Sequence, residues 1–393
     1  MYLDCAATTK PKQEVVDTMM VYLTEHWHNP SALSIDSATV KKDIDNARNI
    51  AAKAIHAKNG DNIFFTSGGS ESNCWAIQGF INNRLNNMHV PYIITTKIEH
   101  KSIMECLKNQ TLATVYYLDV DKDGFISLHE LDDTILLMLS CGVEPKDILI
   151  SIQFANNEVG TIQDVINIGN IAHMYGCVFH TDAVQAFGHV YIDVDAMGID
   201  MLSASAHKIG GCKGTGFLYV KNNIEINPLI YGSQMNGMRG GTENVAGIMG
   251  MAKAIELIDL DKANNLKFTR DYFIDKLIDI GCRLNGPDGN AVFRYRLPNN
   301  INVMLPNDIN GEGFVLVVSM DSIDIGTGSA CNSHSIEPSY VLKAMGLTDN
   351  EADCSIRISI PDDMTMDDVD DVVNIIKVNI DNINAMPEKT NNN

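Results

Sequence analysis

The sequence contains no run of about 18 apolar residues, which is the length that a membrane-spanning helix needs. Its first residues, MYLDCAATT, also lack the basic stretch and the apolar stretch of a signal peptide. Hydrophobic residues make up 45% and charged residues 20% of the 393 positions, as in ordinary globular proteins with sizeable cores. We therefore expect a cytoplasmic protein that does not bind membranes.

Positive charge is scarce in this sequence. Lys and Arg number 29 against 50 Asp and Glu, which gives a formal net charge of −21. Proteins that bind nucleic acid directly usually present a basic face, because phosphates are repelled by an acidic surface. The composition thus predicts no direct nucleic-acid partner.

The nine cysteines include no C-x-x-C pair. An odd, scattered set argues against a disulfide framework and against a zinc ribbon, and most of these cysteines are expected to be small buried hydrophobes. Residues 119–130, DVDKDGFISLHE, do match the key positions of an EF-hand calcium loop. However, the preceding TLATVYYL predicts a strand where an EF-hand needs a helix. We expect no metal site, with calcium binding by this loop as the alternative.

Helical and strand-like stretches alternate through the first two thirds of the sequence. Residues 38–57 carry apolar side chains at helical spacing and predict a helix. Short apolar stretches that predict strands are residues 63–66, 92–95, 114–118, 148–154 and 178–180. Because strands separated by helices are typical of parallel sheets, we expect a large, mostly parallel α/β domain over residues 15–250.

The pattern changes after this region. Residues 246–280 predict one long helix, and strands are expected at residues 300–305, 313–319 and 355–360. Thr365 and Asp368 predict a capping box at the start of a last amphipathic helix. We assign residues 1–14 and 251–386 to a smaller α+β domain, followed by a tail at residues 387–393.

A lysine beside a glycine-rich turn stands out in SASAHKIGGCKGTG, residues 203–216. Lys208 follows His207 there, and Ser205 lies two residues before that histidine. A lysine that is shielded from water can act as a nucleophile toward a cofactor aldehyde, and the serine and histidine could bind a phosphate. A lysine before such a turn is more often simply solvated, so this stretch alone does not decide between the two.

An acidic residue ends an apolar strand in HTDAVQAFGH, residues 180–189. Asp182 could pair with a protonated ring nitrogen and keep the ring able to accept electrons, and Gln185 could bond a ring hydroxyl. The alternative for Asp182 is an ordinary helix cap.

Two further segments offer cofactor contacts. FTSGGSESN, residues 65–73, predicts a strand, a small-residue turn and a helix start, where Gly69 and Ser70 could hold a phosphate on unpaired N–H groups. An ordinary strand-to-helix turn explains this segment as well. His100, in IEHKS, could stack on a ring, although a lone histidine after a strand is usually structural.

Taken together and in this order, the segments resemble the cysteine desulfurases of the class V aminotransferase family, in particular the NifS/IscS-like branch. These are enzymes of fold type I that depend on pyridoxal 5'-phosphate (PLP). The similarity covers nearly the whole chain, through the further motifs YLDCAATT (2–9), ANNEVG (155–160), GMRGGTENV (237–245), GSACNSHSIEPSYVLKAMG (328–346) and SIRISI (355–360).

The resemblance implies a role for each matching residue. Lys208 would carry the PLP, Asp182 would pair with its ring nitrogen, Gln185 would bond its ring oxygen, and His100 would stack on the ring and assist proton transfer. Other contacts implied are phosphate binding by Ser70, Ser205 and His207, with Thr242 from the second subunit of a homodimer, and substrate binding by Asn157 and, through the substrate carboxylate, Arg357.

Cys331 lies in IGTGSACNSHS (325–335), a segment rich in Gly and Ser. The resemblance implies that this cysteine takes sulfur from L-cysteine as a persulfide, leaves L-alanine, and delivers the sulfur to an acceptor such as an iron–sulfur scaffold protein, for cluster assembly or thiolation. A selenocysteine lyase or another class V aminotransferase is an alternative activity. A calcium-binding or scaffold protein without activity is an alternative of another class.

The sequence departs from the family pattern at Cys5, within residues 28–40, at Cys212 and at Pro361. None of these positions belongs to the implied catalytic set.

Overall fold

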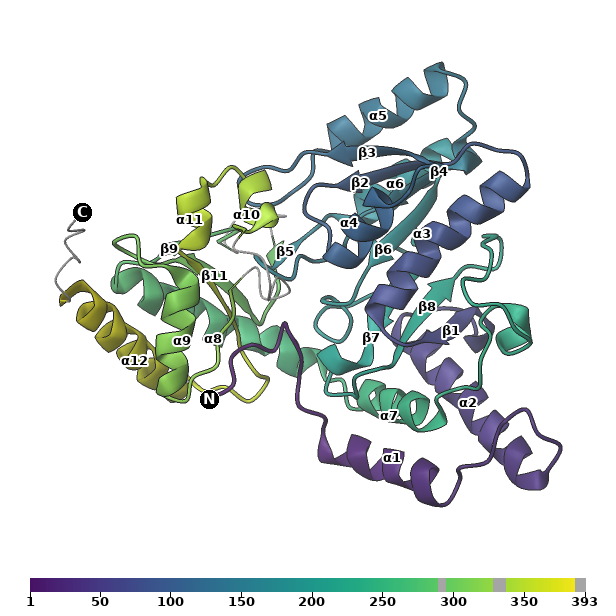
Figure 1. Cartoon of the computed structure of the whole chain (residues 1–393), viewed down its shortest axis with the longest axis horizontal. Helices are drawn as coiled ribbons and strands as arrows, with labels where there is room; N and C mark the ends of the chain where they lie inside the picture. Colours follow the sequence, from purple (N-terminus) through teal and green to yellow (C-terminus); the bar gives the residue numbers. More distant parts are fainter. Residues whose placement is uncertain (289–294, 328–336, 386–393) are drawn as a thin grey trace, which may run out of the picture.

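The computed structural model describes residues 1–288, 295–327 and 337–385. A mixed sheet lies at the centre of its larger part (Figure 1). Its strands are β1 (Ile63–Thr66), β2 (Tyr92–Thr96), β3 (Thr114–Leu118), β4 (Ile148–Ser151), β6 (Val178–Asp182), β7 (Met201–Ser205) and β8 (Gly216–Val220). The spatial order is β1-β8-β7-β6-β4-β2-β3, and only β8 runs antiparallel to its neighbours within this sheet. The predicted mostly parallel α/β sheet is confirmed.

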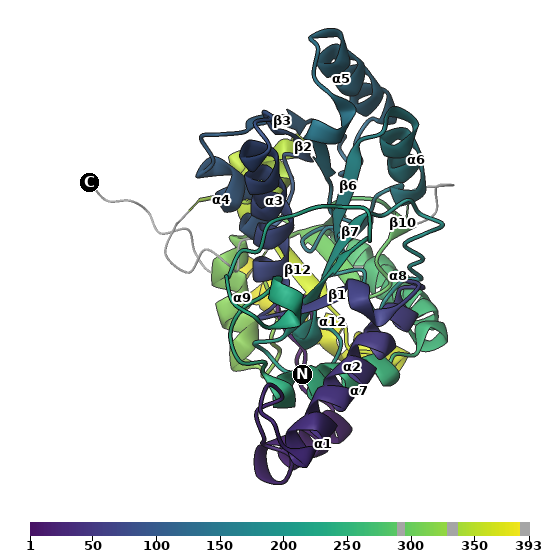
Figure 2. The same cartoon turned by 90° about the vertical axis from the view of Figure 1, so that its right-hand side faces the viewer.

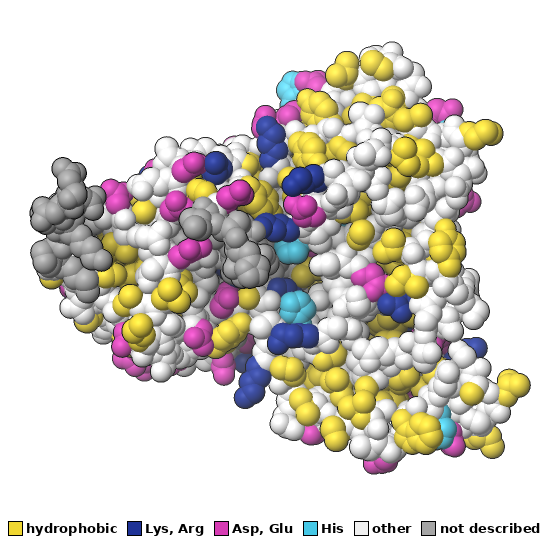
Figure 3. Space-filling model, in the orientation of Figure 1, with side chains coloured by type: hydrophobic (Ala, Val, Ile, Leu, Met, Phe, Trp, Pro, Cys, Tyr) yellow, Lys and Arg dark blue, Asp and Glu magenta, His cyan; other side chains and the backbone are white. Residues whose placement is uncertain are grey.

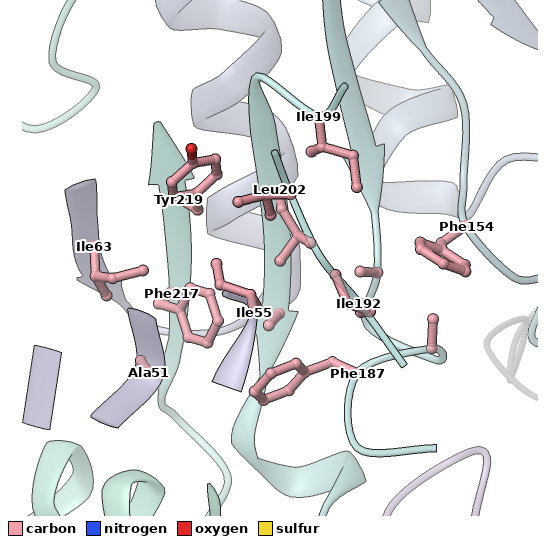
Figure 4. Close-up of a cluster of buried hydrophobic side chains, with 14 of the residues drawn as sticks. Ala51, Ile55, Ile63, Phe154, Phe187, Ile192, Ile199, Leu202, Phe217 and Tyr219 are labelled. Carbon is pink, nitrogen blue, oxygen red and sulfur yellow. The ribbon is translucent and has the colours of Figure 1, made fainter. Parts of the chain in front are cut away.

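Helices cover both faces of this sheet because successive strand side chains point to opposite sides. Ile93 and Met201 pack on one face with α3 (Gly69–Asn86) and α4 (Lys101–Lys108). On the other face, a core around Leu202 and Phe217 joins strands to helices (Figure 4). The helices on that side are α2 (Ile35–Ala54), α5 (Leu128–Ser140), α6 (Val165–Tyr175) and α7 (Val245–Glu256), with α1 (Gln13–Thr24) packed on α7.

A second hydrophobic core forms a smaller α+β part. It is built on an antiparallel sheet in the order β12-β11-β9 and on three helices. The elements are α8 (Leu260–Asp279), β9 (Arg283–Leu284), β11 (Asn300–Met304), α9 (Gly311–Met320), β12 (Ser355–Ser359) and α12 (Met366–Ala385). Leu3 is buried in this core, so the first residues cross over from the larger part. In Figure 1 this part lies to the left of the larger sheet, and in the turned view of Figure 2 it lies behind that sheet. The exact domain boundaries at residues 14 and 250 stay a prediction.

The remaining short elements lie between the two parts. They are β5 (Thr161–Ile162), which pairs with β10 (Tyr295–Arg296), and the short helices α10 (Tyr340–Ala344) and α11 (Asp349–Asp353). Within the described ranges, no helix combines the length and the apolar composition that crossing a bilayer requires.

Two predicted elements were wrong. The single helix over residues 246–280 is two helices, because the chain breaks after α7 and Asp259 caps α8 by accepting a hydrogen bond from the Lys262 amide. The strand over residues 313–319 is helix α9, which Asn310 caps and which buries Phe314 and Val318 one turn apart. The predicted capping box is present, since Thr365 Oγ1 accepts from the Asp368 amide at 3.1 Å.

Candidate active site

A cavity of about 290 Å³ opens where the parallel strands of the large sheet end. In open α/β sheets, the carboxyl ends of the strands are the usual place for a ligand. Lys, Arg and His side chains follow this junction between the two parts, on a protein that is acidic as a whole (Figure 3). The lining residues are Ala6, Ala7, Gly69, Ser70, Asn73, His100, Ser102, Gln153, Ala155, Asn157, Asp182, Val184, Gln185, Ser205, His207, Lys208 and Arg357.

Lys208 reaches the N-terminal segment across the cavity. It lies in a short 3₁₀ turn directly after β7. Its Nζ donates to the Ala6 carbonyl and, at 2.7 Å, to the Ala7 carbonyl, and Gln185 Nε2 donates to the Ala6 carbonyl at 3.0 Å. The amine is therefore placed in the cavity by neutral backbone oxygens.

Asp182 is a buried carboxylate at the end of β6. Its Oδ2 accepts a 2.6 Å hydrogen bond from Asn73 Nδ2, and its Oδ1 accepts a 2.9 Å hydrogen bond from the Val184 amide. Both donors are neutral. Within residues 1–288, 295–327 and 337–385, Asp182 forms no ion pair, and a buried carboxylate without one is unfavourable, so this arrangement suits a ligand that brings positive charge.

His100 caps the start of α4 and shares the same hydrogen-bond chain. Its Nδ1 accepts a hydrogen bond from the Ser102 amide at 3.1 Å and lies 2.8 Å from Ser102 Oγ. Ser102 Oγ also accepts a hydrogen bond from Asn73 Nδ2 at 3.0 Å. Burial lowers the pKa of His100, while the nearby Asp182 opposes that shift and Lys208 adds to it. Since Nδ1 accepts from a backbone N–H, the neutral ring carries its hydrogen on Nε2.

The turn before α3 requires glycine. Gly68 has φ of 149°, and a Cβ at Gly69 would lie 2.5 Å from Val184 Cγ2. Gly69 and Ser70, at the start of α3, line the same cavity as Ser205 and His207, and the N–H groups of a first helical turn can bind an anion. Burial lowers the pKa of His207 to about 4, so this histidine is neutral at pH 7 and can act as a hydrogen-bond partner.

Arg357 projects from β12 into the same cavity, with its side chain 4% exposed. Its Nη2 donates to Asp4 Oδ1 at 2.7 Å and its Nη1 donates to the Asn157 carbonyl at 3.3 Å, whereas its buried Nε meets no acceptor among the described residues. A guanidinium has five N–H groups, so donors remain for a bound carboxylate.

The family model for aminotransferase class-V matches residues 1–372. The chain belongs to the class-V aminotransferase family. It is 42% identical over 387 residues to a cysteine desulfurase IscS of Clostridium botulinum, covering 96% of this chain and 93% of that protein. It is 43% identical over 385 residues to a cysteine desulfurase IscS of Methanosarcina thermophila, covering 96% and 91% of the two chains.

Solved structures agree with this assignment. A NifS-like protein superposes with a TM-score of 0.86 at 32% identity, covering 96% of this chain and 98% of the other. The structure of SspA in complex with cysteine gives a TM-score of 0.77 at 36% identity, covering 92% and 98%. Both similarities extend over the two parts of the chain.

Class-V aminotransferases of the cysteine desulfurase type use PLP, and the cavity fits this group. Lys208 offers an amine for the aldehyde. Asp182 forms no ion pair with any residue that the structure describes, and a protonated ring nitrogen would supply a cationic partner. The glycine turn before α3, with Ser205 opposite, offers neutral donors to a phosphate.

The cavity is thus lined by predicted cofactor and substrate residues from six separate segments of the class-V chain. Thr242 is not among them, because it lies exposed in the loop before α7. Cys331 lies outside the described residues. The departures at Cys5 and Cys212 are buried thiols, and Cys212 Sγ contacts Thr215 Oγ1 at 3.6 Å.

Sequence reasoning assigned no role to Asp4, Asn73 or Ser102. Asn73 had a usable signal, because it follows Ser70 by one helical turn and so shares its helix face. Asp4 had none, since its partner Arg357 lies at the other end of the chain.

The segment that matches an EF-hand loop forms a turn between β3 and α5. Asp121 Oδ1 accepts from the Asp123 and Phe125 amides at 2.9 and 3.0 Å, and Lys97 Nζ lies 2.5 Å from Asp119 Oδ1. Across the described ranges, the carboxylates of this loop are not gathered into a group that could hold a metal ion. The geometry favours the strand-to-helix turn.

Proposed function

We propose that this class-V enzyme is a PLP-dependent cysteine desulfurase, which converts L-cysteine to L-alanine and transfers the sulfur to Cys331. The observation that carries the proposal is one cavity in which the Lys208 amine, the Asp182 carboxylate and the Arg357 guanidinium meet. Relatives named cysteine desulfurase, similar over 96% of the chain, support the choice of reaction.

The substrate would be oriented by its carboxylate. Arg357 binds that group through the guanidinium hydrogens that Asp4 leaves free, and the Asn157 side chain, which also lines the cavity, completes the contact. Asp4 holds the arginine in place, so the pair acts as a positioned clamp at the edge of the small sheet.

Proton transfer would fall to two residues. PLP supplies an electron sink that stabilises negative charge on the substrate carbon. Lys208 Nζ takes up the Cα proton, and Asp182 with Gln185 and Asn73 keeps the ring site in place. His100, neutral because burial lowers its pKa, exchanges a proton at Nε2.

Sulfur transfer would use Cys331 as the nucleophile. Its thiolate attacks the sulfur of the bound cysteine, so that an S–S bond forms while the Cβ–S bond breaks. The electron pair stays on carbon, which takes a proton and yields alanine. The Cys331 persulfide then passes its outer sulfur to an acceptor protein, for which an iron–sulfur scaffold is the proposed class, in the cytoplasm.

The test is an absorbance scan of the PLP-loaded protein, followed by L-cysteine addition with assays of alanine and sulfide. We expect a visible cofactor band that changes with cysteine, and alanine in equal amount to transferred sulfur. Lys208→Ala should lose the band, and Cys331→Ser should keep the band but lose sulfur transfer. A protein that PLP does not colour would contradict the proposal, as would alanine formation at the wild-type rate by Cys331→Ser. The same assay with selenocysteine or an amino-group acceptor separates the alternative activities.

A homodimer is also proposed, because exposed apolar side chains gather at one end of the molecule. Leu23, Trp27, Leu33 and Ile35 are all exposed at the end of α1 and the start of α2, where Figure 3 shows hydrophobic side chains close together. A patch of this kind marks a protein interface. In such a dimer, Thr242 would reach the phosphate of the second subunit, which fits its exposed position in this chain.

A further inference from the structure

Two cysteines that the proposed reaction does not use lie in contact behind the cavity. Cys74 is in α3 and Cys106 is in α4, and their Sγ atoms are 3.4 Å apart. Both side chains are partly exposed, so small reagents can reach them. Most other described cysteines are buried singly, which leaves this pair chemically distinct.

The contact places the two thiols so that one can bond to a reagent and the other can resolve that bond. The contact between the two sulfur atoms lowers the pKa of Cys74, whereas the same contact and burial raise the pKa of Cys106. By contrast, burial raises the pKa of Cys177 and Cys282 to about 12. A partly exposed thiolate beside a second thiol is the usual arrangement of a redox-sensitive cysteine.

The pair is also connected to the cavity. Asn73, directly before Cys74, donates to Asp182 Oδ2 at 2.6 Å and to Ser102 Oγ at 3.0 Å. Ser102 lies one helical turn before Cys106, on the same face of α4. Two contacts therefore join α3 to α4, the Asn73–Ser102 hydrogen bond and, one turn further along α4, the Cys74–Cys106 contact.

We propose that Cys74 and Cys106 form a redox-active dithiol, which a low-molecular-weight disulfide converts into an intramolecular disulfide that weakens cofactor binding. The Cys74 thiolate attacks one sulfur of the reagent, forms a mixed disulfide and releases one thiolate. Cys106 then loses its proton, attacks the Cys74 sulfur and releases the second thiol. The cysteine pair loses two electrons and the reagent disulfide becomes two thiols.

Bond formation changes the distance between the helices. A disulfide has an S–S length of about 2.05 Å, so the sulfur atoms must approach by roughly 1.4 Å. Because Asn73 and Ser102 belong to the same helix pair, this movement disturbs the hydrogen bonds to Asp182 and His100. We expect the oxidised protein to bind PLP at least about fivefold more weakly.

The test uses the full chain with Cys331→Ser, so that oxidation of Cys331 plays no part, and oxidised glutathione as the reagent. Peptide mass spectrometry should find the Cys74 and Cys106 peptides joined, and PLP titration should show the weaker binding. Cys106→Ser should instead end with glutathione on Cys74, and Cys74→Ser should form no such product. Cys141→Ser, which removes an exposed lone cysteine, should behave like its parent.

Either of two results would overturn the proposal. One is a stable glutathione adduct on Cys74 while Cys106 is intact, which would mean that the pair does not close. The other is a mapped Cys74–Cys106 disulfide with unchanged PLP affinity, which would mean that the pair is not coupled to the cavity. Neither result depends on desulfurase activity, so failure here is distinct from failure of the proposed function.

Discussion

Asn73 holds Asp182 from behind the wall of the cavity. Its amide donates to Asp182 at 2.6 Å, so Asn73→Ala would leave a buried carboxylate oxygen without its donor. Loss of such a bond costs about 1–3 kcal/mol. We expect PLP affinity to fall about tenfold, measured by titration of the apoprotein with PLP.

A matched control is Asn82→Ala, which removes an amide from the same helix but away from the cavity. That variant should bind PLP as the parent does. If Asn73→Ala also binds PLP with parental affinity, Asp182 does not depend on this hydrogen bond.

His180 should make stability fall in acid. It is fully buried, its ring nitrogens lie 2.9 Å from Ser151 Oγ and 3.0 Å from Ser203 Oγ, and burial lowers its pKa to about 3. The unfolded chain takes up this proton near pH 6.5, whereas the folded chain does not until about pH 3. The stability contributed by the neutral ring is therefore complete above pH 6.5 and declines as the pH falls toward 3.

Urea unfolding at pH 7.5 and at pH 5 tests this expectation. His180→Gln should reduce the difference between the two unfolding free energies by about 2 kcal/mol. His129→Gln changes a histidine whose side chain is 82% exposed and should leave the difference unaltered. An unaltered difference in His180→Gln would show that His180 does not set the acid sensitivity.

Residue-level reasoning from sequence found side chains that line the cavity where they follow a strand end, and their roles stay predictions. Asp182 and Lys208 lie near the cavity because β6 and β7 end there, and periodicity locates such ends. Asp4 could not be found in this way, because its bond to Arg357 depends on the small part folding against the first residues.

At the scale of elements, Ser339 fixes α10 to Glu158, the neighbour of the cavity residue Asn157. Its Oγ caps α10 through the Leu342 amide at 3.2 Å and donates to Glu158 Oε2 at 2.5 Å. Burial raises the pKa of Glu158 to about 7, and the Ser339 hydrogen bond opposes that shift. Ser339→Ala should therefore raise the pKa of Glu158 further and loosen the start of the helix by about 1 kcal/mol.

We expect Ser339→Ala to release alanine several-fold more slowly while binding PLP normally, because Glu158 neighbours Asn157 but does not line the cavity. Ser339→Thr keeps a capping hydroxyl and should restore the rate. A parental rate in Ser339→Ala would show that this anchor has no influence on turnover.

The prediction of a secondary-structure element was wrong where the residue types favoured a strand but packing against the core favoured a helix. Residues 313–319 are rich in valine and suggested a strand, but the Asn310 cap and the burial of Phe314 and Val318 on one side select α9. The core of the small part decides this outcome, and periodicity over seven residues cannot separate the two structures.

At the scale of the whole molecule, the exposed apolar patch at α1 and α2 is the proposed dimer interface, so a charge placed there should change the oligomeric state. Leu23→Asp places a charge in the proposed interface and should convert a dimer to a monomer in light scattering after size exclusion. Leu316→Asp changes a similarly exposed leucine on α9 and should leave the dimer intact. A monomeric parent, or a dimeric Leu23→Asp, would contradict the proposed interface.

The N-terminal segment has a consequence for how the protein is made. Leu3 and Asp4 are synthesised well before their partners Asp324, Arg357 and Ser359, which lie more than 300 residues further along the chain. Domains generally fold as they emerge, N-terminal parts first. The large sheet can therefore form early, but Ala6 and Ala7 take their places beside Lys208 only after residues 324–359 have been synthesised. Cofactor loading accordingly follows the synthesis and folding of the small part of the molecule.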